Sequence, residues 1–248
     1  KKPWSDYRKI FVKESRIVAG VKFYKTNINL IQEVAEKYEV DPFIVVTIAG
    51  VESNYGIHHS QYSVFNSLYS QIHDMPKRSK WATRELAEFL KYCYSDNLDP
   101  QEIGGSYAGA FGFGQFIPSS FTRYSVDFNG NGVREPYDWA DVLGSIANYL
   151  RMNGYKANSK NYTKSGDIYK SVFAYNHADN YVMAVLELTE KIRERATGIK
   201  SQVIDYGAEH KNFKDAFAKA RSDLGPNATF IWNKRSYSTR ISGYNTKK

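Results

Sequence analysis

The sequence contains a single cysteine, Cys93, among its 248 residues. A lone cysteine excludes an intramolecular disulfide, so the fold has to rest on a noncovalent core. Cys93 stands in a helical pattern and is interpreted as a core thiol. Long apolar runs are also missing: no stretch reaches the roughly 20 apolar residues that a membrane-spanning helix needs.

Several ligand-binding signatures are absent as well. The glycine-rich stretch at 104–114 is not followed by Gly-Lys-Ser/Thr, which excludes a Walker loop, and no predicted strand precedes it, which excludes a dinucleotide fingerprint. His58, His59 and His73 lack a third partner at metal-ligand spacing, which indicates surface or hydrogen-bonded histidines. No nucleic-acid recognition motif occurs, so nucleic acid is not expected as a partner.

Positive charge and tyrosine are plentiful. The net charge is +8, which favours an anionic partner, and the basic residues are spread along the chain. The chain has 20 tyrosines, 14 phenylalanines and 4 tryptophans. This combination suits a groove that stacks on sugar rings or bases, and it suits a well-packed core equally well.

Residues 41–56 (DPFIVVTIAGVESNYG) predict one short, largely buried helix. Asp41 is a good N-cap, and Pro42 fits the first turn, where its missing N–H is no loss. The residues that follow are apolar nearly all round, which indicates a core helix, and Gly56 is expected to stop it.

Glu52 lies in the last turn of this predicted helix. A carboxyl group packed against apolar side chains loses hydration of its charged form, so the pKa of Glu52 is expected to be raised. A glutamic acid that is still protonated near neutral pH can protonate a leaving oxygen, as a glycosidase requires. On this stretch alone the alternative is a partly exposed Glu at a helix end with no special role.

Other helices are predicted from apolar residues at helical spacing. They cover residues 27–40, 81–94, 139–152 and 171–195. Residues 1–25 lack a clear period and are interpreted as an arm or short helix packed on the outside. After residue 196 the pattern indicates a linker, a short helix at 212–221 and a hairpin of 229–232 with 236–240.

Residues 127–138 (DFNGNGVREPYD) have the opening of a calcium loop of EF-hand type. Loop positions one, three, five and six are Asp127, Asn129, Asn131 and Gly132. The twelfth position is Asp138 instead of the usual Glu, and Asp141 could close a longer loop. Because carboxylates are few and Arg134 opposes them, the predicted affinity is modest. The alternative is a polar turn held by side-chain hydrogen bonds without metal.

A second polar candidate is Gln115, which stands in the apolar, glycine-rich stretch 106–121 (SYAGAFGFGQFIPSSF). Such an amide either binds a ligand or ties down its own loop, and the residues alone leave both interpretations open. Tyr175, Asn176 and Tyr181 are polar-tipped residues at the start of the last long predicted helix. They could equally be core tyrosines with satisfied hydroxyls.

Four motifs in this order resemble the membrane-bound lytic transglycosylase B family, the family-3 lytic transglycosylases of bacterial peptidoglycan. They are residues 50–56 (GVESNYG), 109–120 (GAFGFGQFIPSS), the Asp127 loop with 145–150 (SIANYL), and 174–177 (AYNH). The match spans about residues 27–195. It implies a mainly α, lysozyme-like domain of the goose-type and lytic transglycosylase class over residues 1–196. Within it, 57–104 would be a helical insertion and 127–141 the EF-hand-like loop; residues 197–248 would be a linker and a helix-hairpin appendage.

The resemblance also implies the reaction. The β-1,4 bond between N-acetylmuramic acid and N-acetylglucosamine would be cleaved without water, giving a 1,6-anhydro sugar. Glu52 would first protonate the glycosidic oxygen and then accept the proton of the sugar's own 6-hydroxyl, so no second carboxylate and no cofactor is required. A hydrolytic muramidase and a non-catalytic glycan-binding or cell-wall assembly protein are the alternatives.

Site residues follow from the same resemblance. The residues implied to line the groove are Ser106, Gln115, Tyr149, Tyr175, Asn176, Tyr181 and Arg78. Gln115 and Tyr175 would lie nearest the scissile bond, and Arg78 stands where the family often has paired arginines. The implied calcium ligands are Asp127, Asn129, Asn131 and the Val133 carbonyl, with Asp141 or Asp138 closing the loop.

The implied partners are peptidoglycan glycan strands and, through them, the cell-wall machinery. We expect a monomer in the periplasm or cell envelope of a bacterium, with a phage virion as the alternative setting. The net positive charge suits a polyanionic wall polymer.

Overall fold

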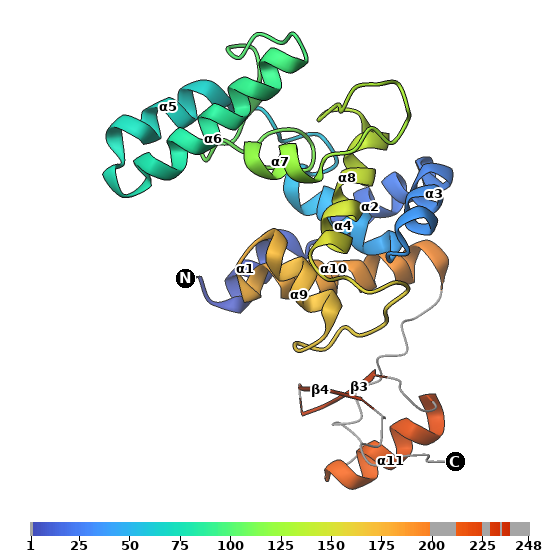
Figure 1. Ribbon diagram of the computed structural model, residues 1–248. Helices are drawn as coiled ribbons and strands as arrows, with labels where there is room; N and C mark the ends of the chain where they lie inside the picture. Colours follow the sequence, from blue (N-terminus) through green and yellow to red (C-terminus); the bar gives the residue numbers. More distant parts are fainter. Residues whose placement is uncertain (1, 199–211, 225–228, 234, 239–248) are drawn as a thin grey trace, which may run out of the picture.

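The computed structural model describes residues 2–198, 212–224, 229–233 and 235–238. Helices dominate it, which confirms the mainly α fold (Figure 1). The helices are α1 (Trp4–Phe11), α2 (Glu14–Thr26), α3 (Ile28–Tyr38), α4 (Pro42–Ser53), α5 (Val64–Asp74), α6 (Pro76–Ser95), α7 (Pro118–Tyr124), α8 (Trp139–Met152), α9 (Asp167–Tyr175), α10 (Asp179–Thr197) and α11 (Phe213–Leu224). Two antiparallel strand pairs accompany them: β1 (Tyr62–Ser63) with β2 (Gly104–Gly105), and β3 (Thr229–Trp232) with β4 (Arg235–Ser238).

Helix α4 lies at the centre of the fold. It packs against α2, α3, α8 and α10, so it is enclosed on all sides (Figure 1). Every residue from Phe43 to Val51 is buried, as the apolar pattern predicts. Because each fully buried aliphatic or aromatic side chain contributes about 1.5–3 kcal/mol, this helix carries a large share of the burial energy.

A helical hairpin made of α5 and α6 projects from this core (Figure 1). It falls within residues 57–104, and the β1–β2 pair lies at its base, with Tyr62 opposite Gly105 and Ser63 opposite Gly104. Helix α6 begins earlier than predicted because Pro76 occupies its first turn, where proline is favoured. The sequence pattern did not predict α5.

Two sequence-based expectations were wrong. Residues 1–25 form two helices, and α2 is no outer arm, because it buries Ile17 and Phe23 against α4 and α10. The helix expected over 171–195 is two helices, α9 and α10. They are separated where Asn176 and Ala178 adopt extended backbone conformations.

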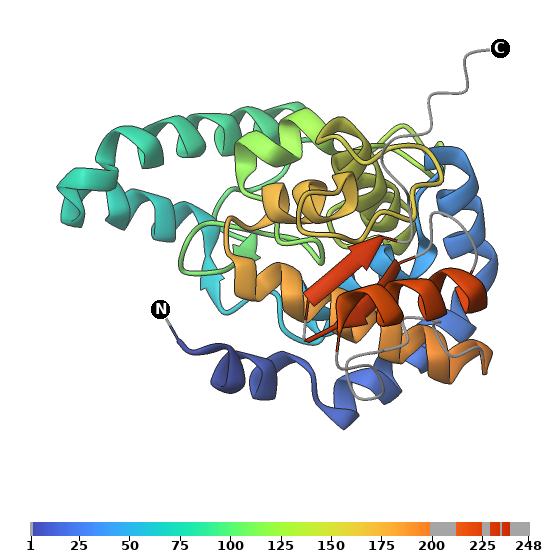
Figure 2. The ribbon, with the colours of Figure 1, turned by 90° about the horizontal axis from the view of Figure 1, so that it is seen from below.

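The C-terminal part contains the predicted helix and hairpin. Figure 2 shows β3 and β4 beside α11, and the small cluster between them is built from Ala216, Ala220, Phe217, Trp232 and Tyr237. The predicted strand positions 239 and 240 and most of the predicted linker lie outside the described residues. Within the described ranges, no helix combines the length and apolarity required to cross a membrane.

A buried polar cluster fixes the N-terminal end of α4. Asp41 accepts a hydrogen bond from the Phe43 amide (2.9 Å), so it is the N-cap that the sequence predicts. Its other oxygen accepts from the Tyr162 hydroxyl and from the Arg193 guanidinium of α10. The Asp41 side chain is only 4% exposed, so these donors replace its lost hydration.

We predict that Asp41→Asn lowers the free energy of unfolding by about 2 kcal/mol, because an amide still caps α4 but leaves the largely buried guanidinium of Arg193 with Glu190 as its remaining carboxylate. Urea denaturation followed by far-UV circular dichroism measures the change. Glu14→Gln is the matched control, because Glu14 pairs with Arg195 on the surface. Equal urea midpoints for the two variants would contradict the prediction.

Candidate active site

The end of α4 positions Glu52. The helix stops at Ser53 because Asn54 takes the left-handed conformation (φ 50°), so Asn54 and not Gly56 is its C-cap. Tyr55 and Gly56 continue in the left-handed region, which reverses the chain immediately after the carboxylate. The Ser53 hydroxyl holds this turn, since it accepts from the Gly56 amide (3.0 Å) and donates to the Ala49 carbonyl (3.1 Å).

Tyr55 locks this reversal onto the core. Its ring stacks on Phe23 of α2, with 5.1 Å between the ring centroids. The ring also lies directly over Gly50, where a Cβ would come within 2.4 Å of it, so position 50 requires glycine. The turn beyond Glu52 is therefore rigid, and it holds the carboxyl group at a fixed place on the rim of the core.

The Glu52 carboxyl group is half-buried and has one direct hydrogen-bond partner. The hydroxyl of Tyr181, on α10, donates to its Oε1 at 2.6 Å. Burial raises the pKa of Glu52 to about 7, and the bond from Tyr181 opposes that rise. The carboxyl is thus partly protonated at neutral pH, as the sequence predicts from its apolar neighbours. Across the described residues, no second carboxylate contributes to this pKa.

Tyr181 itself is 2% exposed. Burial, and then the charge of Glu52, raise the pKa of Tyr181 well above its ordinary value. The phenol therefore keeps its proton and acts as a permanent donor to the carboxylate. This arrangement favours the ionised form of Glu52 only slightly, since burial remains the larger effect.

Tyr175, at the end of α9, lies on the same side. Burial, and then the charge of Glu52, raise its pKa well above the ordinary value, which places its hydroxyl near the carboxyl group. That hydroxyl donates to the Gly114 carbonyl at 2.6 Å. The ring contacts Tyr149 (4.7 Å between centroids) and Phe116 (5.4 Å). The Tyr149 hydroxyl donates to the Ala174 carbonyl at 2.7 Å, so Tyr149 supports Tyr175 from behind.

Gln115 belongs to the same loop as Gly114. Its backbone is in the left-handed region (φ 49°), a conformation that costs energy for a residue with a Cβ. Its side-chain Nε2 donates to the Gly112 carbonyl at 2.8 Å and to the His59 carbonyl at 3.4 Å. The amide therefore ties its loop together, while its Oε1 remains available to a ligand.

The remaining groove candidates lie apart from Glu52 to different degrees. Ser106 closes a tight turn, where its hydroxyl accepts from the Ala110 amide at 3.2 Å. Asn176 is exposed beside Tyr175, at the break between α9 and α10. Arg78 lies in the first turn of α6, next to the turn that joins α5 and α6, and its guanidinium lies over the Trp81 ring, 4.3 Å from the ring centroid. The described structure gives Arg78 no contact with Glu52.

One residue of the site was missed by the sequence analysis. Tyr7, on α1, is half-buried, and burial followed by the nearby Glu52 carboxylate raises its pKa above the ordinary value. The helical period of α1 is clear only once its bounds are known, because the helix has no fully buried residue. Tyr7, Tyr175 and Tyr181 thus place three phenols around one carboxyl group.

The Asp127 loop lies beside the N-terminus of α8. Asp127 accepts from the amides of Gly130 (2.7 Å) and Gly132 (2.7 Å), which gives the loop its turn. Asp141, 1% exposed and one of the two residues expected to close the loop, accepts from the amides of Phe128 and Glu135, both at 2.8 Å.

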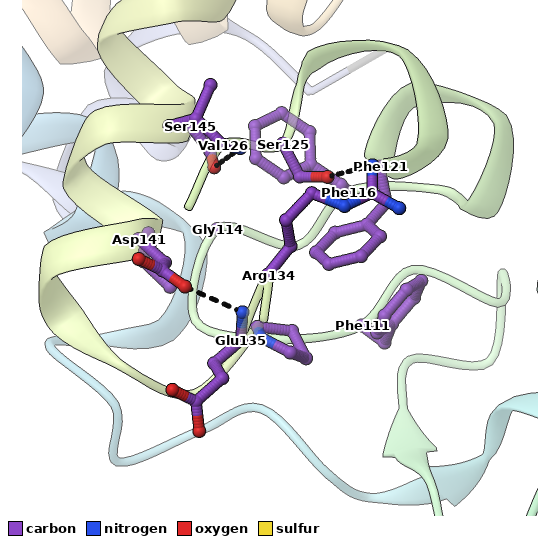
Figure 3. Close-up of a pocket in the computed structure, with 12 residues that line it drawn as sticks. Phe111, Gly114, Phe116, Phe121, Ser125, Val126, Arg134, Glu135, Asp141 and Ser145 are labelled. Carbon is purple, nitrogen blue, oxygen red and sulfur yellow. Dashed lines mark hydrogen bonds between the residues drawn. The ribbon is translucent and has the colours of Figure 1, made fainter. Parts of the chain in front are cut away.

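Figure 3 shows the hydrogen bonds that support this loop. The backbone amide of Glu135 donates to the Asp141 carboxylate, and the backbone amide of Val126 donates to the Ser145 hydroxyl. The Arg134 guanidinium donates to the Ser125 hydroxyl. The cavity behind them holds about 10 Å³, close to the limit for one water molecule, so it is packing space and no ligand site.

Further side-chain and backbone oxygens of the loop come from four other residues. Asp138 caps α8, because its Oδ1 accepts from the Ala140 amide at 2.9 Å, and Val133 is exposed with its carbonyl in the loop. The Asn129 and Asn131 side-chain oxygens each accept one backbone N–H, at 3.0 Å and 2.8 Å. Within the described ranges, no three His, Cys, Asp or Glu side chains converge as a metal-binding group.

Comparison with known proteins places this geometry in a family. Residues 1–165 match the family described as transglycosylase SLT domain. Over 152 residues the chain is 35% identical to the membrane-bound lytic murein transglycosylase B of Escherichia coli. The matched region covers 61% of this chain and 42% of that protein. The chain therefore spans less than half the length of this curated relative.

Solved structures share the fold. The lytic transglycosylase SLT35 of Escherichia coli, solved in complex with calcium, gives a TM-score of 0.73 at 26% identity, covering 78% of this chain and 79% of that one. The soluble lytic transglycosylase SltB1 of Pseudomonas aeruginosa gives 0.74 at 28% identity, covering 80% and 85%. These matches confirm the lysozyme-like helical fold. Because the family match covers well over half of the 248 residues, the chain belongs to the transglycosylase SLT domain family.

Proposed function

We propose that the protein is a peptidoglycan lytic transglycosylase that cleaves the bond between N-acetylmuramic acid and N-acetylglucosamine without water. One observation carries the proposal. Glu52 is a single carboxyl group with a pKa of about 7, and no other carboxylate in the described structure acts on it. A hydrolysis uses two carboxyl groups, whereas a reaction in which the substrate supplies the nucleophile needs only one, and Glu52 is the one carboxyl group that the pKa shift and the ordered motifs single out.

The proposed reaction uses the two protonation states of Glu52 in turn. The protonated carboxyl gives its proton to the glycosidic oxygen, and the bond from that oxygen to the anomeric carbon breaks. The substrate's own 6-hydroxyl then attacks the anomeric carbon, and the Glu52 carboxylate takes the proton of that hydroxyl. The products are an anhydro sugar and a free 4-hydroxyl, and Glu52 returns to its starting state.

The phenols around Glu52 have matching roles in this proposal. Tyr181 donates to Oε1, so the other oxygen is left to exchange the proton with the substrate. Tyr175 orders the Gly114 carbonyl and with it the adjacent Gln115, whose free Oε1 can accept from an acetamido N–H of the glycan. Tyr7, on α1, adds a third neutral phenol close enough for the charge of Glu52 to raise its pKa.

The setting follows from the substrate. We propose that the protein acts on glycan strands in the bacterial periplasm or cell envelope, as a monomer, with a phage virion as the alternative setting. The charge of +8 supports attraction to an anionic wall polymer.

Glu52→Gln is predicted to lower the rate of product release from purified sacculi at least about a thousandfold, since the amide can neither give nor take the proton. Mass spectrometry of the soluble products measures the effect and identifies the chemistry. Wild-type protein is expected to release anhydro-muropeptides. Glu33→Gln is the control, because it removes an exposed carboxylate on α3 and is expected to keep full activity.

Two results would contradict the proposal in different ways. Reducing-end products, heavier by one water, would identify a hydrolytic muramidase. Wild-type protein that binds sacculi but releases nothing would identify a glycan-binding or assembly protein.

The pH dependence of kcat/KM tests the protonation state of Glu52. Because the free enzyme must carry the proton, we predict that the rate falls about tenfold per pH unit above a midpoint near 7, which is the pKa of Glu52. Tyr181→Phe removes a bond that lowers this pKa, so the midpoint is expected to move upward. An unmoved midpoint in Tyr181→Phe would show that another group controls the profile.

Stability supplies an independent check on the same pKa. The folded pKa lies above the unfolded value, so the native state binds more protons between about pH 4.5 and 7, and ionisation of Glu52 destabilises the fold as pH rises through that window. Glu52→Gln is therefore expected to be more stable than wild type by about 3 kcal/mol near pH 8. At about pH 4 the difference is expected to vanish.

We further propose that the Asp127 loop binds calcium weakly, as a structural ion that takes no part in the proton transfers. Its available donors are all oxygens, which suits Ca²⁺: the side chains of Asp127, Asn129, Asn131 and Asp138 and the carbonyl of Val133. Asp141, which holds the loop through amide hydrogen bonds, is the alternative to Asp138 as the carboxylate that closes the loop. The SLT35 structure with calcium supports the assignment.

With a Kd of about 1 mM, about 10 mM Ca²⁺ is expected to stabilise the fold by about 1.4 kcal/mol and to raise Tm by roughly 3–6 °C. Differential scanning calorimetry with calcium, magnesium or a chelator measures the shift. Asp127→Asn is expected to remove it and Asp6→Asn, on α1, to leave it intact. A shift of the same size with magnesium, or its survival in Asp127→Asn, would contradict the site.

A further inference from the structure

The projecting hairpin carries a cleft of about 480 Å³ that the proposed reaction does not use. Most of its lining residues belong to α5, among them Asn66, Ser70 and Gln71. Tyr62 and Tyr107 form its walls, and they are 53% and 72% exposed. The volume lies in the range of roughly 300–1,000 Å³ that is typical of small-molecule sites.

Gln71 is the unusual residue in this cleft. Its side chain is buried at 5% exposure, and its Nε2 donates to the carbonyls of Ser67 (3.0 Å) and Tyr107 (3.1 Å). Its Oε1 is buried too, yet it accepts no hydrogen bond from any described residue. A buried acceptor without a donor costs about 1–3 kcal/mol, so this oxygen, on a side chain that lines the cleft, is suited to a ligand that brings an N–H or O–H.

The wall that carries Tyr107 is fixed before any ligand arrives. Besides the bond from Gln71 to the Tyr107 carbonyl, Gly109 packs directly onto Leu68 of α5. A Cβ at position 109 would lie 2.5 Å from the Leu68 side chain, and φ there is +85°, so only glycine permits this approach. A preformed cleft loses little conformational entropy on binding.

The lining defines the ligand by its chemistry. Two tyrosine rings offer flat apolar faces with polar tips, and between them stand hydroxyl and amide groups. A pyranose with an acetamido group has the matching features: an apolar C–H face, several hydroxyls and one N–H donor. Asp74 is the one acidic or basic residue among the described lining residues, so an anionic peptide stem would meet only a like charge inside the cleft.

We propose that this cleft is a subsite for a neutral N-acetylhexosamine unit of the glycan strand, away from the bond that is cleaved, with Gln71 Oε1 accepting from the sugar. The proposal rests on the proposed function, because it extends the same substrate. The loop of Tyr107 connects the two places: Ser106 precedes it, and Gln115 and Gly114 follow in the same bridged loop near Tyr175.

The test measures binding against oligosaccharide length. β-1,4-linked N-acetylglucosamine oligomers, from the dimer to the hexamer, are titrated by calorimetry into the Glu52→Gln protein. We expect the hexamer to bind more tightly than the dimer. Tyr107→Ala and Ser70→Ala are each expected to weaken hexamer binding roughly tenfold and to leave dimer binding unchanged. Tyr94→Ala is the matched control, because Tyr94 is 91% exposed on α6 and lies outside the cleft.

A second measurement reports on Gln71 directly. The hexamer is expected to shift the side-chain NH₂ signals of Gln71 in a ¹H–¹⁵N spectrum, and the dimer to leave them in place. Gln71→Met, with a melting curve to show that it is folded, is expected to lose the length dependence.

The failures are distinguishable. Length-independent binding, or an unshifted Gln71 signal with the hexamer, would overturn the subsite while anhydro-muropeptide release by wild type still supported the proposed function. Binding of a free peptide stem that shifts the Gln71 signal would also overturn the sugar assignment. Failure of every oligomer to bind, together with no release of products from sacculi, would overturn both proposals.

Discussion

The chemistry of the site depends on the desolvation of one carboxyl group at the end of a buried helix. Glu52 is held where α4 meets the surface, and burial raises its pKa to about 7. An acid with this pKa can both give and take a proton near neutrality, which a carboxyl in water cannot do efficiently. The surrounding phenols complete the site without adding charge, because their own raised pKa values keep them neutral.

Helix α4 can hold Glu52 in this way because both of its ends are fixed. At the N-terminus, Asp41 joins the cap of the helix to Arg193 on α10. At the C-terminus, Tyr181 joins Glu52 to the same α10. The core helix and α10 are thus connected by two polar contacts about a helix length apart, and the apolar residues between them prevent sliding. A displaced carboxyl group would lose both its burial and its donor.

Sequence reasoning was most accurate where local chemistry decides the structure. The N-cap and proline at 41–42 mark the start of α4, and the bounds of α8 follow from a regular apolar stripe with Asp138 as its cap. Sequence reasoning was wrong where a tertiary contact decides. Asn54 ends α4 before Gly56, because Tyr55 has to turn back onto Gly50.

The features that sequence reasoning missed, α5 and Tyr7, also depend on tertiary contacts. Helix α5 packs along α6 and buries Val64 and Leu68, but its tie to the loop of Tyr107 runs through a buried amide, Gln71, which no apolar period predicts. Tyr7 and Glu52 are 45 positions apart in the sequence. They come near each other through the packing of α1 on α10. Motif spacing identified Tyr175 and Tyr181, but which hydroxyl contacts Glu52 follows only from the break between α9 and α10.

The glycine-rich loop connects the projecting hairpin to the site around Glu52. One arm of the loop is held on α5 by Gln71 and Gly109, and the other is held on α9 by the Tyr175 hydroxyl. Between the arms, bridges from Gly105 to Phe111 and from Phe111 to Phe116 make the loop a single rigid piece. The loop therefore links the hairpin to the Glu52 region. A glycan strand bound along both would present its glycosidic bonds to the carboxyl group in a defined register.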